Sequence, residues 1–109
     1  MAKTNKDLNR RLELHSILEE VLGSKNVYFQ PPESKKLSYP CVVYHRETGR
    51  SNFANNKTYM FSYRYQIIYI DRDPDSDFPT RLMERLPKCI YDRHYTADNL
   101  NHEALNLYY

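Results

Sequence analysis

The sequence predicts one α+β domain, with a mostly antiparallel sheet and two helices packed on one face. Three observations predict this class: an amphipathic helical stripe near the N-terminus, a long strand pattern in the middle, and a short helix pattern between strands. The resulting order is α-β-β-β-α-β-β, and strands on both sides of a helix are typical of α+β folds. The chain has 109 residues, which fits a single domain covering residues 1–109.

The first predicted helix covers residues 5–22. Thr4 or Asn5 can cap its start, and Gly23 stands where a left-handed residue commonly ends a helix. Charged residues fill the rest of the helix surface. The apolar residues that fall largely on one stripe are Leu8, Leu12, Ile17, Leu18, Val21 and Leu22.

Two short strands are predicted at residues 27–29 and 40–47. Pro31 and Pro32 end the first strand because proline lacks a backbone donor and holds the chain extended. Tyr39 precedes Pro40, and a residue before proline is pushed out of the helical region. A polar loop over residues 48–56 is expected to return the chain.

The longest strand pattern covers residues 58–70. Alternate positions carry large apolar or aromatic side chains, which is the period-2 signal of a half-buried strand. From Ile68 onward both faces are apolar, so we expect that end to be covered on both sides. The aromatic and apolar parity consists of Tyr59, Phe61, Tyr63, Tyr65, Ile67 and Tyr69.

The last third of the chain predicts a helix at residues 76–86 and two closing strands. Pro79 is tolerated only in the first turn of that helix, and Pro87 stops it. The closing strands, residues 89–95 and 103–109, are expected to enclose a polar loop.

Composition excludes several classes of function. Sixteen basic and fourteen acidic residues give a net charge of +2, which does not indicate a strong nucleic-acid binder. No apolar run approaches the length that spans a bilayer, so we expect no membrane association. No secretory signal is recognised, and Cys41 and Cys89 are predicted to be reduced thiols of a cytosolic product.

An acidic run resembles part of a calcium loop, because Asp71, Asp73 and Asp75 alternate as carboxylate ligands do, with Asp77 next in the series. The turn glycine and the terminal glutamate of such a loop are replaced by Ser76 and Leu82. The run is therefore interpreted as a helix cap formed by Asp75, Ser76 or Asp77.

Enzymatic and cofactor chemistry is not expected. The histidines at positions 15, 45, 94 and 102 lack the spacing of a zinc site. His94 follows Asp92 by two residues and could be an oriented base, but no nucleophile is identifiable beside it. With only Gly23 and Gly49, the chain has neither a phosphate-binding loop nor a dinucleotide fingerprint. We predict no enzyme, no metal and no cofactor.

The tyrosine-rich strand supports one rival hypothesis, a small single-stranded nucleic-acid-binding module. Its rings could stack on bases while Arg64 or Lys57 meets phosphates. The low net charge and the missing glycine-aromatic motif of RNA-binding sheets disfavour this hypothesis, and core or subunit contact is the favoured role of these tyrosines.

Several segments in order resemble one family. Asn-Val-Tyr-Phe-Gln-Pro-Pro at residues 26–32 and Tyr-Pro-Cys-Val-Val-Tyr at residues 39–44 are similar to the tail-terminator or tail-completion proteins of long-tailed bacteriophages. Residues 70–77, residues 91–102 and the C-terminal Leu-Asn-Leu-Tyr-Tyr extend the likeness to roughly the whole chain.

The resemblance implies a binding function in a virion. Such proteins form a ring, most often a hexamer, at the head-proximal end of the tail tube, where they end tube growth and join tail to head. Expected partners are sister copies, the tail tube protein and the head-tail connector, with DNA passing through the channel without specific binding. The protein would be assembled in the bacterial cytoplasm. A head-completion ring of similar size is the alternative.

A closed ring requires two different patches on each subunit. We predict that long polar-aromatic segments supply them, and that the connector at residues 31–36 and the loop at residues 50–57 become ordered only on assembly. The small core also predicts a marginally stable isolated chain. The predicted interface residues are Arg46, Arg50, Asn52, Phe53, Tyr59, Tyr63, Tyr65, Tyr91, Arg93, His94 and Tyr95.

Overall fold

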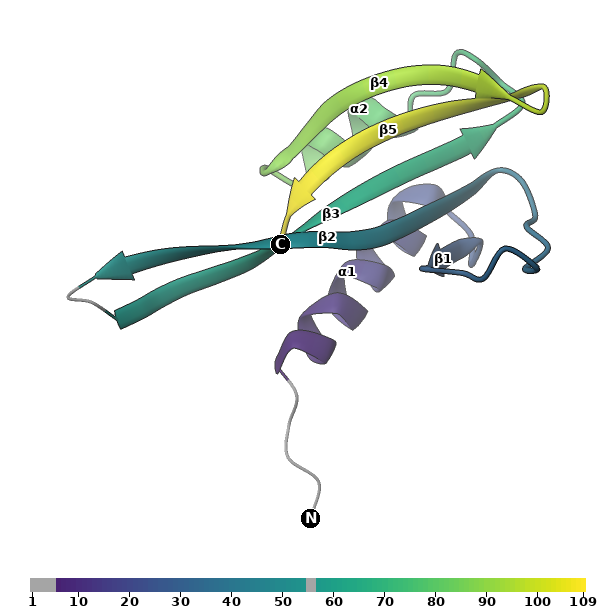
Figure 1. The fold of residues 1–109 in the computed structure, drawn as a ribbon. Coiled ribbons are helices and arrows are strands. Elements are labelled where there is room, and N and C mark those ends of the chain that lie inside the picture. The colour runs from purple at the N-terminus through teal and green to yellow at the C-terminus, as the bar shows by residue number, and fades with distance from the viewer. Residues whose placement is uncertain (1–5, 55–56) are drawn as a thin grey trace.

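The structure is a computed structural model that describes the backbone of residues 6–54 and 57–109, and the side chains of residues 6–49 and 62–109. Its element order confirms the predicted α-β-β-β-α-β-β arrangement (Figure 1). The elements are α1 (Lys6–Leu22), β1 (Val27–Phe29), β2 (Cys41–Ala54), β3 (Lys57–Asp71), α2 (Phe78–Arg85), β4 (Cys89–Ala97) and β5 (Leu100–Tyr108).

The strands form one mixed five-stranded sheet in the order β1-β2-β3-β5-β4. Every neighbouring pair is antiparallel except β1 and β2, which are parallel, with Tyr28 opposite Val43. The parallel pair forms because the connector between these strands, residues 30–40, carries the chain back before β2 begins. The predicted sheet is therefore confirmed, with one parallel pair at its β1 edge.

Both helices lie on one face of the sheet, behind it in the view of Figure 1. The core between the layers combines Leu14 and Leu18 of α1, Phe78 and Leu82 of α2, and alternate residues of the strands. The buried strand residues are Val42, Tyr44, Tyr65, Ile67, Tyr69, Leu105 and Leu107. The predicted aromatic parity of β3 is thus confirmed for Tyr65, Ile67 and Tyr69.

The helix ends follow the local sequence. Gly23 has φ +83° and its backbone N–H donates to the carbonyl of Glu19 at 2.8 Å, so it ends α1 as predicted. Asp77 precedes α2 without a side-chain capping bond. The Ser76 hydroxyl instead accepts the backbone N–H of Phe78 at 3.3 Å, so Ser76 is the member of the predicted cap that binds the helix start.

Two predicted loops are wrong. Strand β2 continues to Ala54, through most of the predicted loop at residues 48–56, because it pairs with β3 along its whole length. The predicted loop between the closing strands shrinks to the two-residue turn Asp98-Asn99, with φ values of +54° and +61°. Asp and Asn tolerate this left-handed conformation better than most residues, which permits a tight hairpin.

The two cysteines are free and buried, which confirms their prediction as unpaired thiols. Burial raises the pKa of both thiols to about 11. Cys41 and Cys89 are therefore packing residues of the fold.

Candidate subunit interface

The β2–β3 hairpin extends beyond the rest of the sheet as a two-stranded arm, defined here as residues 49–54 and 57–63. Strand β1 ends opposite Tyr44, and β5 ends with Tyr108 opposite Arg64. Past these positions β2 and β3 pair only with each other (Figure 1). The Tyr63 carbonyl still accepts the backbone N–H of Tyr109 at 2.9 Å. Beyond this bond, no strand of the described part of the chain lies along either outer edge of the arm, which makes these edges templates for pairing with another chain.

Besides Tyr63 at its base, four predicted interface residues lie in the arm. Arg50 is opposite Ser62 and Asn52 is opposite Met60 in the hairpin register. Phe53 and Tyr59 also belong to its strands. Their side chains, and residues 55–56 of the predicted mobile loop, lie outside the described part of the structure, so their interface role stays a prediction.

The arm begins at a cation–aromatic cluster around Arg46. The guanidinium carbon of Arg46 lies 3.9 Å from the centre of the Tyr63 ring, and one terminal nitrogen donates to the Tyr65 hydroxyl at 3.0 Å. The Tyr63 hydroxyl in turn donates to the Asp7 carboxylate of α1 at 3.1 Å. Two predicted interface residues, Arg46 and Tyr63, therefore fix the direction in which the arm leaves the body.

Tyr65 belongs to the core of the subunit. Its side chain is only 2% exposed, and its ring packs 5.9 Å from that of Tyr44. A residue covered within its own chain has little surface to offer a neighbour. Although it was predicted as an interface residue, Tyr65 is therefore a core residue of its own subunit.

Among the described residues, the face of the sheet opposite the helices is covered near one end. There the 30–40 connector lies beside the sheet and encloses an apolar pocket of about 320 Å³. The pocket is lined by Val43, Ile68, Ile70, Tyr95 and His102 of the sheet and by Pro31, Pro32, Glu33, Lys35 and Leu37 of the connector. This open-face pocket confirms that the Ile68 end of β3 is apolar on both faces.

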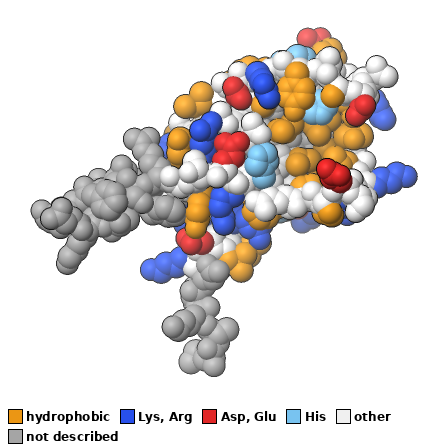
Figure 2. Space-filling model, viewed as in Figure 1, with side chains coloured by type: hydrophobic (Ala, Val, Ile, Leu, Met, Phe, Trp, Pro, Cys, Tyr) orange, Lys and Arg blue, Asp and Glu red, His pale blue; other side chains and the backbone are white. Residues whose placement is uncertain are grey.

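Figure 2 shows this face, where hydrophobic side chains gather together with histidines over the sheet. The Tyr95 and His102 rings stack at 4.7 Å, and the Arg93 guanidinium lies 5.3 Å from the centre of the Tyr95 ring. Nearby on β4, Ile90 is 63% exposed. Toward the arm the residues become polar, with Gln66 opposite His45 and Asn106.

A bulge in β4 divides the predicted interface residues of this strand between the two faces. The pairing passes from Tyr91 opposite Leu105 to Arg93 opposite Ala104, so Asp92 is the extra residue. Tyr91 shares the face of the buried Leu105, whereas Arg93 and Tyr95 belong to the opposite, open face. The bulge also makes this exposed edge strand less regular as a template for pairing.

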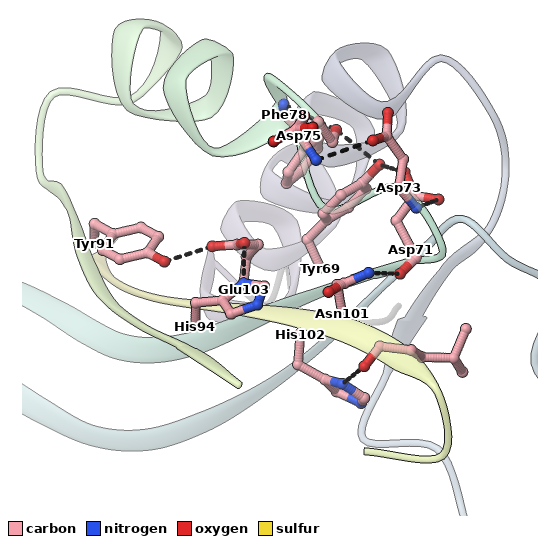
Figure 3. A network of polar contacts seen from close by, with 12 residues as sticks. Tyr69, Asp71, Asp73, Asp75, Phe78, Tyr91, His94, Asn101, His102 and Glu103 are labelled. Atoms are coloured by element: carbon pink, nitrogen blue, oxygen red, sulfur yellow. Dashed lines mark hydrogen bonds and ion pairs between the residues drawn. The ribbon is translucent and has the colours of Figure 1, made fainter. Parts of the chain in front are cut away.

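Glu103 joins His94 and Tyr91 on the helix side of the sheet (Figure 3). The Tyr91 hydroxyl donates to Glu103 Oε2 at 2.5 Å, and the other carboxylate oxygen contacts His94 Nδ1. The hydrogen bond to Glu103, with some burial, raises the pKa of Tyr91 to about 12. Among the described residues, the partner of the His94 ring is the Glu103 carboxylate, which orients the imidazole.

The acidic run forms a turn stabilised by its own backbone, also drawn in Figure 3. Asp71 accepts the backbone N–H of Asp73 at 3.2 Å, and Asp73 accepts that of Asp75 at 2.9 Å. Asp71 also accepts the Tyr69 hydroxyl at 2.5 Å. Within the described ranges no cluster of three histidine, cysteine or acidic residues is arranged to hold a metal ion.

The remaining histidines make local contacts. His15 Nδ1 is hydrogen-bonded to the Tyr44 hydroxyl at 2.8 Å, and His45 lies 3.7 Å from the Glu47 carboxylate. His102 Nδ1 lies 3.2 Å from the backbone carbonyl of Leu100. Each histidine is thus paired within its own neighbourhood.

Sequence reasoning missed the contacts of Glu103 with Tyr91 and His94, and it also missed the open-face pocket. The first could have been found by placing a two-residue turn at Asp98-Asn99, since that register sets His94 opposite Glu103. The pocket depends on where the connector lies, and no local pattern in residues 31–37 indicates that path.

None of the helices in the described part of the chain is long and apolar enough to cross a membrane. Comparisons with protein-family models, with curated proteins and with solved structures find no match to this chain. What the protein does must therefore be inferred from its own sequence and geometry.

Proposed function

We propose that this protein is a structural subunit of a long-tailed phage that assembles into a ring, most simply a hexamer, at the head-proximal end of the tail tube. The ring ends tube growth, joins the tail to the head connector and leaves a channel for DNA. Its function is binding, without bond-making chemistry. The resemblance of residues 26–32, 39–44, 70–77, 91–102 and 105–109 supports the family.

The observation that carries this proposal is the two-stranded arm. The arm projects past the layers of the body, and along most of its length its two outer edges lack a strand partner among the described residues. Such edges expose a solitary domain to aggregation. A neighbouring copy that covers the arm would satisfy those backbone groups. Heterologous contact of this kind, arm on one side and body on the other, repeats around a closed ring.

The nucleic-acid hypothesis is weaker than the sequence suggested. Tyr65 and Tyr69 of the aromatic parity are 2% and 4% exposed, so their rings are packed against the helices. Base stacking requires ring faces that are open to the ligand. The surface that remains open carries mixed polar and apolar residues beside a net charge of only +2.

An arm-shortened variant tests the proposal. Replacing residues 51–61 by Asn-Gly joins Arg50 to Ser62, which are already opposite each other in the hairpin. Light scattering of the wild type is expected to give one closed multimer, and the variant is expected to be a monomer with unchanged circular dichroism of its folded body.

A matched control places the same Asn-Gly pair at Asp98-Asn99, which alters a hairpin turn but keeps the arm. This control should assemble like the wild type. A wild-type protein that stays monomeric and binds a fluorescent single-stranded oligonucleotide with steep salt dependence would support the nucleic-acid module instead. An arm-shortened variant that still forms the same multimer would show that the arm does not carry assembly.

A further inference from the structure

Strand β4 is the long free edge of the body. It is the last strand in the sheet order β1-β2-β3-β5-β4 and has 9 residues, whereas β1 at the other edge has 3. Among the described residues, the one backbone bond that β4 makes outside its pairing with β5 is at its start, where Cys89 donates to Leu86 at 3.1 Å. The rest of its outer side is available to another strand.

Past its bulge, β4 has a regular segment over residues 93–97. The two-residue hairpin turn that follows makes Ala97 and Leu100 a hydrogen-bonded pair. Hydrogen-bonded and non-hydrogen-bonded positions alternate along an antiparallel pair. The backbone N–H and C=O groups of His94 and Thr96 therefore face away from β5, toward the outside of the sheet.

The arm has a matching regular segment on its β2 edge, residues 48–52. It lies between the two shifts in the hairpin register, which follow Arg46 and Asn52. The edge just before this segment is covered within the subunit, because the side-chain oxygen of Gln30 accepts the backbone N–H of Arg46 at 3.2 Å. The open part of the β2 edge thus begins beyond Arg46.

The outward groups of this arm segment follow from the geometry of β3. The Tyr63 carbonyl faces away from β2, since it accepts the backbone N–H of Tyr109 at 2.9 Å. Backbone groups alternate in direction along a strand, so those of the next residue of β3 face β2, where its partner is Thr48. Gly49 and Ser51 consequently direct their N–H and C=O groups outward.

The β3 edge of the arm is less suited to pairing. Its base is already used by the bond between Tyr63 and Tyr109. Near the tip, the register passes from Met60 opposite Asn52 to Thr58 opposite Phe53, so the residue between Met60 and Thr58 is a bulge. The regular stretch of this edge is therefore shorter than residues 48–52 of β2.

We propose that residues 48–52 of one copy pair as an added antiparallel strand with residues 93–97 of the next copy. The inference rests on the proposed ring and names the two strands that meet in it. The segments have equal length, and each directs the backbone groups of its second and fourth residues outward. With Gly49 opposite Thr96 and Ser51 opposite His94, every outward N–H meets a C=O.

The position of the two edges makes this contact heterologous. In Figure 1 the arm leaves the body along the strand direction, whereas β4 lies at the lateral edge of the sheet. Two different parts of the subunit therefore meet, and a contact of this kind repeats around a ring. The sheet of one copy continues into the arm of its neighbour.

The charges of the two segments permit the pairing. Each carries one cation, Arg50 in the arm and Arg93 in β4. The antiparallel register places Arg93 opposite Asn52, so the two cations are not directly opposed. Asp92 and Asp98 add a carboxylate at either end of the β4 segment.

A two-fold pairing of β4 with β4 is the competing arrangement. It would use the same outward groups of His94 and Thr96, but it would stop at a dimer and leave the arm uncovered. In both arrangements the His94 imidazole stays with the Glu103 carboxylate on the helix side of the sheet. The head-to-tail pairing covers both edges at once.

Proline at an outward position tests the pairing and spares the subunit. Proline is tolerated at an edge position whose N–H has no partner in the same sheet, but it removes the donor that an added strand needs. Thr96→Pro and Ser51→Pro are each expected to weaken assembly by about ten-fold or more. Thr96→Val and Ser51→Val keep the N–H and should assemble like the wild type. Circular dichroism confirms that each variant folds, and the arm variant still tests the pairing if Thr96→Pro does not.

Mixing the two proline variants identifies the partner strand. Ser51→Pro keeps an open β4 edge and Thr96→Pro keeps an open arm, so a mixture retains one intact contact. Sedimentation velocity at concentrations where the wild type is assembled is expected to show monomers of each variant alone and heterodimers in the mixture. If β4 instead pairs with β4, Ser51→Pro alone will form dimers.

The outcomes separate this inference from the proposed function. Wild-type rings that both proline variants still form, or a mixture without heterodimers, would overturn the pairing of the arm with β4 and leave the ring standing. A wild-type chain that forms no ring by light scattering would overturn both.

Discussion

His15 Nδ1 lies 2.8 Å from the Tyr44 hydroxyl and joins α1 to the second strand of the sheet through a hydrogen bond next to the core. Burial is the main cause that lowers the pKa of His15 below its ordinary value, although the nearby Glu19 acts in the opposite direction. The folded protein therefore favours the uncharged imidazole of His15.

Stability is expected to fall as the pH drops because of this histidine. In the unfolded chain His15 binds its proton near pH 6.5, whereas the folded chain resists protonation until a lower pH, so the unfolded state binds more protons between the two values. The free energy of unfolding of the wild type minus that of His15→Gln should decrease from pH 7.5 to pH 5.5 in urea titrations. A difference that is constant or grows over this range would show that His15 is not the responsible group.

The Arg46 cluster is expected to stabilise the base of the arm. Arg46→Lys loses the flat guanidinium over Tyr63 and the bond to the Tyr65 hydroxyl, which should lower the free energy of unfolding by about 1 kcal/mol. Arg64→Lys is the control, since Arg64 makes a partly exposed contact of 3.4 Å with Glu47 and should cost less than about 0.5 kcal/mol. Equal effects of the two substitutions in denaturant titrations would contradict the role of Arg46.

The Asp98-Asn99 turn should tolerate only residues that accept positive φ. Asn99→Val is expected to cost about 1–2 kcal/mol because a β-branched side chain is strained at φ +61°. Asn99→Gly should be neutral or slightly stabilising in thermal unfolding. Thr96→Val, in the adjoining strand, should change stability by less than about 0.5 kcal/mol; if Asn99→Val proves equally mild, the tight turn is not formed as described.

The two cysteines should be nearly inert in the folded protein. With a pKa of about 11 instead of 9.0, each thiol has about 100-fold less thiolate at neutral pH than an ordinary one, and burial limits access further. Mass spectrometry after brief iodoacetamide treatment should show almost no labelling in buffer and complete labelling in urea. Rapid labelling of either thiol in buffer would contradict its burial.

Much of the fold could be predicted because local patterns and tertiary packing agree. The alternation of Tyr65, Ile67 and Tyr69 matches the face that the helices cover, and Gly23 ends α1 where its sequence position predicts. The extension of β2 to Ala54 could not be predicted, since residues 48–52 are polar or glycine and form a strand because β3 lies beside them.

The candidate interface was less accessible to sequence reasoning. Aromatic residues such as Tyr63 and Tyr65 suit both a core and an interface, and the burial of Tyr65 against Tyr44 distinguishes them. The pocket beside Ile68 and Ile70 is made by a connector whose path is set by contacts far away in the sequence. Bulges such as that at Asp92 change which face a residue occupies, and no local signal marks them.

Negative-stain electron microscopy of the purified wild-type protein tests the central claim, self-association into a ring, most directly. Class averages are expected to show closed rings of one size with a central channel, and the arm-shortened variant should show none. Fields that contain only particles of monomer size, or open filaments of varied length, would contradict the claim.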